Sequence, residues 1–461
     1  MPGGTRSPVT SANPGNAHGL HGPLECSEVR RQGHHTQPRR SSVDDVSASS
    51  HPTPSADPGP TNEGAAWAPT GSVDLLSEHL YGEVASEAYA WMRREAPVHH
   101  DEVNDLWAIA TWDGVSAASR DSATFSNAGG SRPKFPPIPW MLDMDGTDHI
   151  RRRRVVSKAF TPGSVKAMFP AIAVLCDELV DVVAGRGEFD IVADLAAPLP
   201  MIVIGDMLGI DRDDHDMLLR WSDDLIGSIA GTADRMEAAA AAFGEFDAYA
   251  RRTIEDRRSR PRDDLISALV GAEVDGQRLT EDELVMESLL ILLGGDETTR
   301  NVISGGVELL LCNPGEHARL LADRSLLDGA VEEMLRSVSP IKNMARTVTS
   351  AVEISGTTLL PGYEAVLLYE SANQDEAHFT DPFRFDITRT PNDHLAFGVG
   401  AHYCLGAALA RVEIKAMLSC ILDRLPDLQL IGDAAPERFL GSLRALPVRV
   451  SNHAASAKVL S

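Results

Sequence analysis

The chain has 461 residues, 43% of them hydrophobic, so it can bury a large core in two or three ordinary domains or in one large domain with a tail. Its formal net charge of −25 argues against a broad surface for nucleic acid or anionic lipid, since both need positive charge. No stretch approaches the roughly 18 apolar residues that span a bilayer, and the N-terminus has no apolar signal segment. We therefore expect no membrane anchor.

Residues 1–70 are rich in Pro, Gly, Ser, Thr and His and hold almost no large apolar side chain. Such a segment cannot bury enough apolar surface to fold, so we expect a disordered tail, although a start site placed too far upstream would also explain it. From residue 71 to residue 452 the pattern is mainly helical with a few short strands, which predicts one domain. Residues 453–461 are expected to form a short flexible C-terminal tail.

The five cysteines are widely separated and include no Cys-x-x-Cys pair, so we expect neither a disulfide framework nor a zinc site. This usage favours a reducing compartment and predicts a cytoplasmic location. Three cysteines in apolar helical runs are expected to be plain core residues: Cys176, Cys312 and Cys420.

Four consecutive arginines, Arg151–Arg154, follow Asp148 and His149. By charge alone, such a run is typical of a solvated helix face.

A long helix is predicted from Thr280, where Thr280-Glu281-Asp282-Glu283 fits a capping box, to about Leu311, before Pro314. Two glycines inside this helix, Gly294 and Gly295, cost roughly 1 kcal/mol each relative to alanine. Close approach of a ligand is the expected reason, and a local distortion of the helix would leave backbone carbonyls free to hold water.

The same helix carries an acid beside a hydroxyl, Glu297 and Thr298, a pair that can relay protons. Gly295 and Ile291 lie three and seven residues before Thr298 and share its face. Ile291 is therefore a candidate pocket wall, although an ordinary core position explains it equally well.

Further along, Glu333 and Arg336 stand at i, i+3 and can pair, which by itself is typical of an exposed surface pair. Val352–Ser355 and Ala365–Tyr369, separated by Leu360-Pro361-Gly362, predict a β-hairpin.

The most informative stretch is Phe397-Gly398-Val399-Gly400-Ala401-His402-Tyr403-Cys404-Leu405-Gly406, which presents one thiol from a glycine turn just before a helix. Gly400 and Gly406 permit backbone close to a flat cofactor. The helix N-terminus after Cys404 is expected to lower the thiol pKa and leave a thiolate. A buried structural cysteine is the alternative.

With this loop, the sequence resembles the cytochrome P450 haem-thiolate monooxygenases over nearly all of residues 73–450. The resemblance implies a mainly α fold with small β-sheets, in which haem b lies between the long central helix and the cysteine loop. It implies Cys404 as the axial iron ligand, with Phe397 also at the haem, and Glu297 and Thr298 as the residues that deliver protons for O–O cleavage.

The resemblance also implies two charged sets. The first binds the haem propionates, which need cations of fixed geometry: His149, Arg153, Arg346 and His402. The second is a buried structural lock without a catalytic role: Glu333, Arg336 and Arg389. The remaining arginines of the 151–154 run are expected on the proximal surface, where they suit docking of an acidic ferredoxin.

Within this family, the chain is similar to the actinobacterial steroid side-chain hydroxylases, which oxidise the terminal methyl group of cholesterol or cholest-4-en-3-one in sterol breakdown. The stretches that carry this similarity are Ser126–Gly130, Ala197–Met201, Arg220–Leu225 and Gly294–Arg300. The candidate substrate contacts are Met141, Ile291, Gly295 and Met344. The candidate pocket stretches Pro139–Leu142, Ile341–Met344 and Phe439–Leu443 are largely apolar, with Lys342 and Asn343 as exceptions. Their apolar character suits a bulky lipophilic ligand but does not separate a sterol from a fatty acid, a terpene or a macrolide.

No nucleotide or flavin fold is visible in the sequence, so electrons are expected from NAD(P)H through a separate reductase and ferredoxin. A haem sensor or carrier without turnover is the alternative of another class, and a peroxide-using enzyme is a further one. The Glu297–Thr298 pair argues against both, since a sensor has no need for distal proton delivery and the peroxide-using relatives usually lack this acid–alcohol pair.

Overall fold

The computed structural model describes residues 67–68, 72–82, 84–227, 233–273, 276–432, 434–436 and 443–450. Most of the expected N-terminal tail and all of residues 453–461 lie outside these ranges. The described part begins with β1 (Trp67–Ala68), which pairs antiparallel with β2 (Ser72–Val73). The strand β1 thus lies within the last residues of the expected tail.

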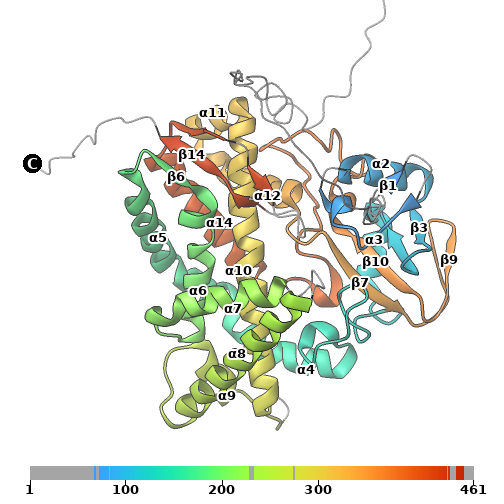
Figure 1. Cartoon of the computed structure of the whole chain (residues 1–461), viewed down its shortest axis with the longest axis horizontal. Helices are drawn as coiled ribbons and strands as arrows, with labels where there is room; N and C mark the ends of the chain where they lie inside the picture. The colour runs from blue at the N-terminus through green and yellow to red at the C-terminus, as the bar shows by residue number, and fades with distance from the viewer. Residues whose placement is uncertain are drawn as a thin grey trace, which may run out of the picture. The chain divides into compact units, whose positions relative to one another are not determined.

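The described residues are mainly helical with small sheets, as predicted (Figure 1). The helices are α2 (Ala85–Glu95), α3 (Trp112–Arg120), α4 (Gly146–Val156), α5 (Pro162–Ala184), α6 (Pro198–Leu208), α7 (His215–Gly227), α8 (Ala233–Ser259), α9 (Leu265–Gly271), α10 (Glu281–Cys312), α11 (Pro314–Ala322), α12 (Leu327–Val338), α13 (Tyr369–Asn373) and α14 (Ala407–Arg424). The strands are β1, β2, β3 (Val98–Asp101), β4 (Leu106–Ile109), β5 (Phe125–Ser126), β6 (Glu188–Asp190), β7 (Asn343–Val348), β8 (Val352–Ile354), β9 (Thr357–Leu359), β10 (Glu364–Leu368), β11 (Leu428–Leu430), β12 (Ala435–Pro436), β13 (Leu443–Ala445) and β14 (Pro447–Val450).

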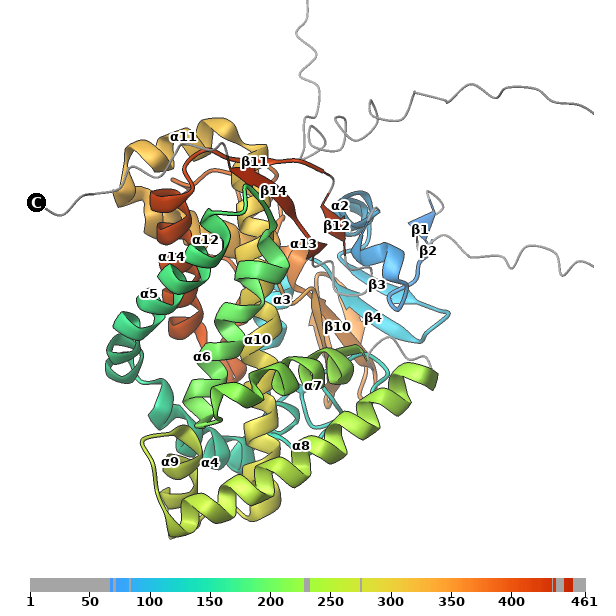
Figure 2. The ribbon, with the colours of Figure 1, turned by 60° about the vertical axis from the view of Figure 1, so that its left-hand side comes forward.

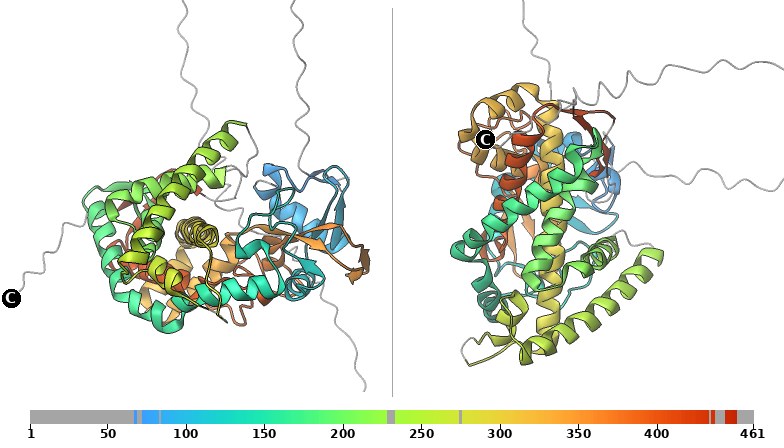
Figure 3. Two further views of the ribbon diagram at one scale, coloured as in Figure 1. Left: turned by 90° about the horizontal axis from the view of Figure 1, so that it is seen from below. Right: turned by 90° about the vertical axis from the view of Figure 1, so that its left-hand side faces the viewer.

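The predicted long helix is α10, and its capping box is formed. The Thr280 hydroxyl accepts the Glu283 amide hydrogen at 3.2 Å, and the Glu283 carboxylate accepts the Thr280 amide hydrogen at 2.9 Å. Viewed nearly along its axis, α10 has helices around one side and the sheet toward the other (Figure 3). It contacts α6, α7, α8, α12 and α14, and α7 and α8 cross beside one end of it (Figure 2). The main hydrophobic core lies around these helices.

The larger sheet has the strand order β3-β4-β10-β7-β5, with β10 parallel to β4 and antiparallel to β7. Strand β7 follows α12 and brings Met344 and Arg346 to the site described below. The predicted hairpin is wrong in its pairing, because β8 pairs with β9 and not with β10. Ser355 and Gly356 both have positive φ, 48° and 80°, and close a two-residue turn that fixes this shorter hairpin.

Cys176 and Cys420 are buried free thiols, in agreement with a core role. Cys312, at the C-terminal end of α10, is instead disulfide-bonded. The expectation that this residue is plain core is therefore wrong.

Among the described helices, none is both long and apolar enough to cross a membrane.

Candidate active site

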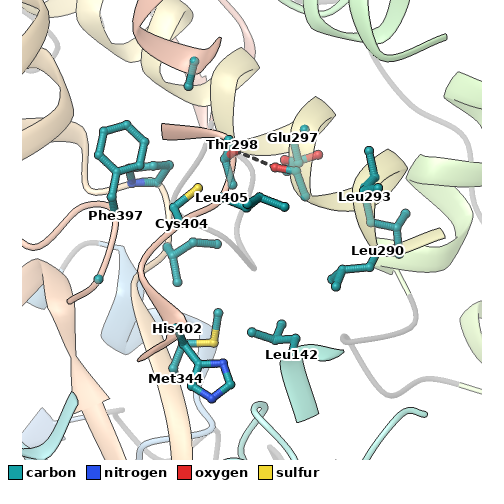
Figure 4. Close-up of a pocket in the computed structure, with 18 of the residues that line it drawn as sticks. Leu142, Leu290, Leu293, Glu297, Thr298, Met344, Phe397, His402, Cys404 and Leu405 are labelled. Carbon is teal, nitrogen blue, oxygen red and sulfur yellow. Dashed lines mark hydrogen bonds between the residues drawn. The ribbon is translucent and has the colours of Figure 1, made fainter. Parts of the chain in front are cut away.

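A cavity of about 610 Å³ is lined by α10 on one side and by the loop that carries Cys404 on the other (Figure 4). Its volume falls within the range of roughly 300–1,000 Å³ that is typical of small-molecule sites. Most of its wall is apolar, and the apolar lining includes Ile138, Trp140, Met141, Leu142, Ile204, Leu289, Leu290, Leu293, Ile341 and Met344. The cavity therefore suits a lipophilic ligand beside a polar end.

The cysteine loop is a tight turn fixed by its backbone. Gly398 and Gly400 have φ of 63° and 84°, a conformation that favours glycine. A Cβ added at Gly400 would lie 2.5 Å from the Ser119 carbonyl oxygen of α3, so no larger residue fits there. The Cys404 amide donates to the Phe397 carbonyl at 2.9 Å, and Phe397 itself lines the cavity. The turn thereby presents the Cys404 side chain to the cavity.

The Cys404 thiol is open to the cavity but otherwise enclosed by protein. Burial raises the pKa of this thiol above its ordinary value, although the Gly406 and Ala407 amides and the charges of Arg153 and Arg411 act in the opposite direction. The expectation that the helix N-terminus lowers the thiol pKa is therefore wrong for the protein without a metal ion, because desolvation outweighs the effect of the helix. A coordinated metal ion deprotonates a thiol outright, so a thiolate arises here with the metal.

The polar end of the cavity holds His149 and Arg153 of α4, Arg346 of β7 and His402 of the loop. The rings of His149 and His402 stack with their centres 4.1 Å apart. The Nε2 atoms of both rings are buried and have no hydrogen-bond partner among the described residues. His402 Nε2 is 3.6 Å from an Asp145 oxygen, too far for a hydrogen bond.

These four residues fit a haem. Burial lowers the pKa of both histidines, so each ring is neutral and has one N–H to donate. Together with the guanidinium groups of Arg153 and Arg346, they offer donors for two carboxylates at one end of a cavity whose other end is apolar. Two propionates next to an apolar macrocycle have this pattern. An added Cβ at Gly406, beside Cys404, would contact no atom within 4 Å, so the cavity is open there.

On the opposite wall, α10 is an unbroken α-helix through Gly294–Thr299, so the expected distortion is absent. The Thr298 hydroxyl donates to the Gly294 carbonyl at 2.9 Å, the usual partner of a threonine inside a helix. Figure 4 places Glu297 and Thr298 on this helix and Cys404, Phe397 and His402 on the loop side. The acid and the hydroxyl therefore line the same cavity as the thiol.

Glu297 is buried, and its carboxylate is already engaged. It forms an ion pair with Arg300, one turn along α10, and accepts a long hydrogen bond of 3.4 Å from Asn301. Arg300 also lies 3.3 Å from Asp223 of α7. Burial raises the pKa of Glu297, and the charge of Arg300 opposes that rise. A proton relay through Glu297 therefore requires Arg300 to move away or to share the carboxylate with water.

The four candidate substrate contacts, Met141, Ile291, Gly295 and Met344, all line the cavity. At Gly295 the structure shows a second reason for a glycine. A Cβ added there would lie 2.5 Å from the Ile204 side chain of α6. Gly295 therefore lets the Ile204 side chain pack closely onto α10, whereas Gly294 faces open space and lines the cavity.

The sequence did not single out Glu287, which is fully buried on α10. One of its oxygens accepts hydrogen bonds from the Met141 amide and from the Arg152 guanidinium, both at 2.9 Å. Arg152 also donates to the Pro139 carbonyl at 2.8 Å. Glu287 and Arg152 thus hold the cavity-wall segment Pro139–Leu142 against α10 and α4. Glu283 and Glu287 are four residues apart and share one face of the helix, which was the available signal. Nothing in the local sequence identified Arg152 as the partner of Glu287.

This network corrects the expectation for the arginine run. Arg151 pairs with Glu283 at 2.5 Å, and Arg152 pairs with Glu283 and Glu287. These two arginines are therefore bound to α10 and are not free for a redox partner.

Glu413 of α14 was also missed, since it stands within an apolar helical run. It is buried and lines the cavity, and one carboxyl oxygen has no hydrogen-bond partner among the described residues. Burial, with the nearby charge of Asp296, raises the pKa of Glu413 to about 8. It is therefore a protonated acid at neutral pH.

Away from the cavity, Glu333 is fully buried and accepts two hydrogen bonds of 2.8 Å from Arg336. Arg389, from the segment after α13, lies 3.1 Å from the same carboxylate. Arg336 also donates to the Asn373 carbonyl at 2.8 Å. The three charged groups thus join α12 and α13 to the segment that leads into the cysteine loop.

Comparison with known proteins agrees with this architecture. The sequence profile of the family Cytochrome P450 matches residues 140–429. The Steroid C26-monooxygenase of Mycobacterium tuberculosis is 50% identical over 82% of this chain and 96% of its own length. That of Mycolicibacterium smegmatis is 47% identical over 82% of this chain and 95% of its own.

Solved structures give the same result. CYP109E1 from Bacillus megaterium in complex with testosterone superimposes with a TM-score of 0.73 at 35% identity, covering 80% of this chain and 99% of its own. Cytochrome P450 PksS of Bacillus subtilis has a TM-score of 0.75 at 32% identity, covering 81% and 99%. The chain belongs to the cytochrome P450 family and is a monooxygenase whose cofactor is a haem with a cysteine-ligated iron.

Proposed function

We propose that the protein hydroxylates the terminal methyl group of a steroid side chain in sterol breakdown, with cholest-4-en-3-one or cholesterol as substrate. The observation that carries this proposal is the identity of 50% to a steroid C26-monooxygenase over nearly the whole length of that enzyme. The mainly apolar wall of the cavity supports it, since a sterol offers a large apolar surface and few polar groups.

Cys404 is the proposed axial ligand. It is the cysteine that lines the cavity, and its amide is fixed by the Phe397 carbonyl. When bound, the haem supplies oxygen activation, and a thiolate ligand favours O–O cleavage. His149, Arg153, Arg346 and His402 are proposed to bind the propionates, because all four line the cavity and the buried Nε2 atoms of both histidines have no partner among the described residues.

Thr298 and Glu297 are proposed to supply protons on the α10 side. The Thr298 hydroxyl can turn from the Gly294 carbonyl toward the cavity by rotation about one bond. Burial raises the pKa of Glu297 above its ordinary value. A carboxyl group is a better proton donor in catalysis when its pKa lies closer to the working pH. The strength of its ion pair with Arg300 determines how readily the Glu297 carboxyl group can take up and donate a proton.

As a P450 monooxygenase, the enzyme takes a lipophilic substrate and receives electrons from redox partners. We propose that these partners are a ferredoxin and its NAD(P)H-dependent reductase. A cytoplasmic location remains part of the same proposal.

The test is an optical titration of the purified haem protein, in which a substrate that displaces the iron-bound water shifts the absorption band. Cholest-4-en-3-one should give a saturable shift at low micromolar concentration. Turnover with ferredoxin and reductase should then give a product hydroxylated at the end of the side chain, identified by mass spectrometry. A clear shift with fatty acids and none with sterols would reverse the assignment.

A further inference from the structure

Arg132 lines the cavity without a partner for its side chain. Within the part of the chain that the structure describes, its guanidinium forms no hydrogen bond and no ion pair, although the residue is half-buried. The other two arginines of the cavity each donate to a backbone carbonyl, Arg153 to that of Tyr403 and Arg346 to that of Ala345. Arg132 thus places a guanidinium with unpaired N–H donors in the wall of a mainly apolar cavity.

Among the charged groups, Asp143 is the one that acts on Arg132, but its carboxylate already accepts hydrogen bonds from the backbone. One of its carboxylate oxygens accepts the Ser131 amide hydrogen at 3.1 Å, and the other accepts the Ile138 amide hydrogen at 2.8 Å. Asp143 therefore holds both ends of the loop that carries Arg132. Its charge only partly offsets the burial that lowers the pKa of the Arg132 guanidinium.

The backbone of this loop holds Arg132 in a fixed place. Gly130 has a φ of 112°, and a Cβ added to it would lie 2.7 Å from the Phe135 carbonyl oxygen. The Ser131 carbonyl accepts the Ala345 amide hydrogen at 2.9 Å, which ties the loop to β7. A donor that is presented to a cavity by a rigid loop, and that has no protein acceptor, is arranged for an acceptor on a ligand.

We propose that Arg132 binds the oxygen that the lipophilic substrate already carries at the end that is not oxidised, such as the 3-oxo group of a steroid. This inference rests on the proposed function for the identity of the substrate. Two histidines and two arginines already serve the haem carboxylates, whereas Arg132 lies on the loop that continues into the wall residues Ile138 and Met141. Substrate oxygen is therefore the better-placed acceptor, and a propionate is the competing one.

The test compares matched ligands by optical titration of the haem protein. The first pair is cholest-4-en-3-one and cholest-4-ene, which differ only in the oxygen. The second pair is hexadecanoic acid and hexadecane. The variants are Arg132→Met, which keeps the length and removes the donors, and Arg132→Lys, which keeps the charge. Lys134→Gln is the control, since Lys134 is on the same loop but pairs with Glu364 at 3.3 Å and does not line the cavity.

A hydrogen bond from a charged donor predicts that the wild type prefers the ketone by about tenfold to a hundredfold. Arg132→Met should lose this preference, Arg132→Lys should keep part of it, and Lys134→Gln should keep all of it. The ratio of haem to protein should be equal in all four proteins. An equal preference in the wild type and in Arg132→Met overturns the proposal, and so does a loss of haem confined to Arg132→Met, which would make Arg132 a propionate ligand.

The second ligand pair separates the two proposals. If the wild type ignores both sterols but binds hexadecanoic acid more tightly than hexadecane through Arg132, the steroid assignment fails and the role of Arg132 stands. If oxygen makes no difference in either pair, the role of Arg132 fails, whichever ligand binds.

Discussion

The guanidinium of Arg411 on α14 lies 4.5 Å from the centre of the Phe397 ring, over the loop that carries Cys404. Glu332 of α12 holds Arg411 through two hydrogen bonds of 2.6 and 2.8 Å. Because the Phe397 carbonyl accepts the Cys404 amide hydrogen, α12, α14 and the ligand loop share one chain of contacts. A cation–π contact of this kind contributes about 0.5–2 kcal/mol.

Replacing Glu332 with Gln should reduce stability at neutral pH and leave it unchanged in strong acid. Burial raises the pKa of Glu332, but Arg411 and His394 outweigh that effect and lower it to about 2, from an ordinary value of 4.5. A lowered carboxyl pKa means that the stabilisation is present above the ordinary value and is lost as the pH falls toward the folded-state pKa. Urea unfolding of both proteins across this range should show a difference of about 1 kcal/mol at neutral pH that vanishes near the lower value. A difference that does not change with pH would contradict this explanation.

Glu333→Gln should be far more damaging than the loss of one of its partners. The substitution leaves two buried or nearly buried guanidinium groups, Arg336 and Arg389, without their carboxylate, which costs about 3–5 kcal/mol. Arg389→Met is the matched control, because it leaves the Glu333–Arg336 pair intact. The free energy of unfolding in denaturant and the ratio of haem to protein should be measured for both variants. Equal stabilities of the two variants would argue against a central role for Glu333.

Thr298→Ala should keep the haem and the substrate-induced spectral shift but divert reducing equivalents to hydrogen peroxide. The reason is that the variant retains the cavity and loses one hydroxyl at the α10 wall. Ser304→Ala is the control, since Ser304 donates to the Arg300 carbonyl on the same helix and does not line the cavity. The ratio of NADH consumed to product formed measures coupling. Unchanged coupling in Thr298→Ala would count against the proton-relay role.

Glu287→Gln should weaken substrate binding without loss of haem, because Glu287 holds the wall segment that contains Met141. Burial raises the pKa of Glu287 to about 6, so in the wild type the carboxylate gains a proton as the pH falls through that value and its ion pair with Arg152 weakens. Substrate affinity of the wild type should therefore fall below about pH 6. The variant, which cannot titrate there, should show no such step, and a step of equal size in both proteins would exclude Glu287 as its origin.

Short-range patterns predicted much of this molecule. The capping box at Thr280 and the apolar run after it gave the correct extent of α10, because helix caps depend on neighbouring residues. The glycine turn gave the place of Cys404 next to a helix for the same reason. Contacts between distant segments were not predictable. Glu287 and Arg152 are 135 positions apart, and nothing in either local sequence identifies the other.

The errors have physical causes as well. The thiol of Cys404 follows a helix N-terminus, but burial outweighs the dipole in setting its pKa, and burial is not readable from the motif. Gly295 was correctly identified as a place of close approach, and the neighbour that the structure shows there is Ile204 of α6, which the local sequence does not identify. In the misassigned hairpin, the tight turn at Ser355 and Gly356 prevails over the longer connection that contains a proline.

The most direct test of the whole account is the reduced carbon monoxide complex of Cys404→Ala, measured beside the wild type and Cys420→Ala. Cys420 is a buried free thiol that lies outside the cavity lining, so its removal controls for the loss of a sulfur. The wild type and Cys420→Ala should show the absorption band typical of a thiolate-ligated haem, and Cys404→Ala should lack it. Persistence of that band in Cys404→Ala would show that another residue ligates the iron.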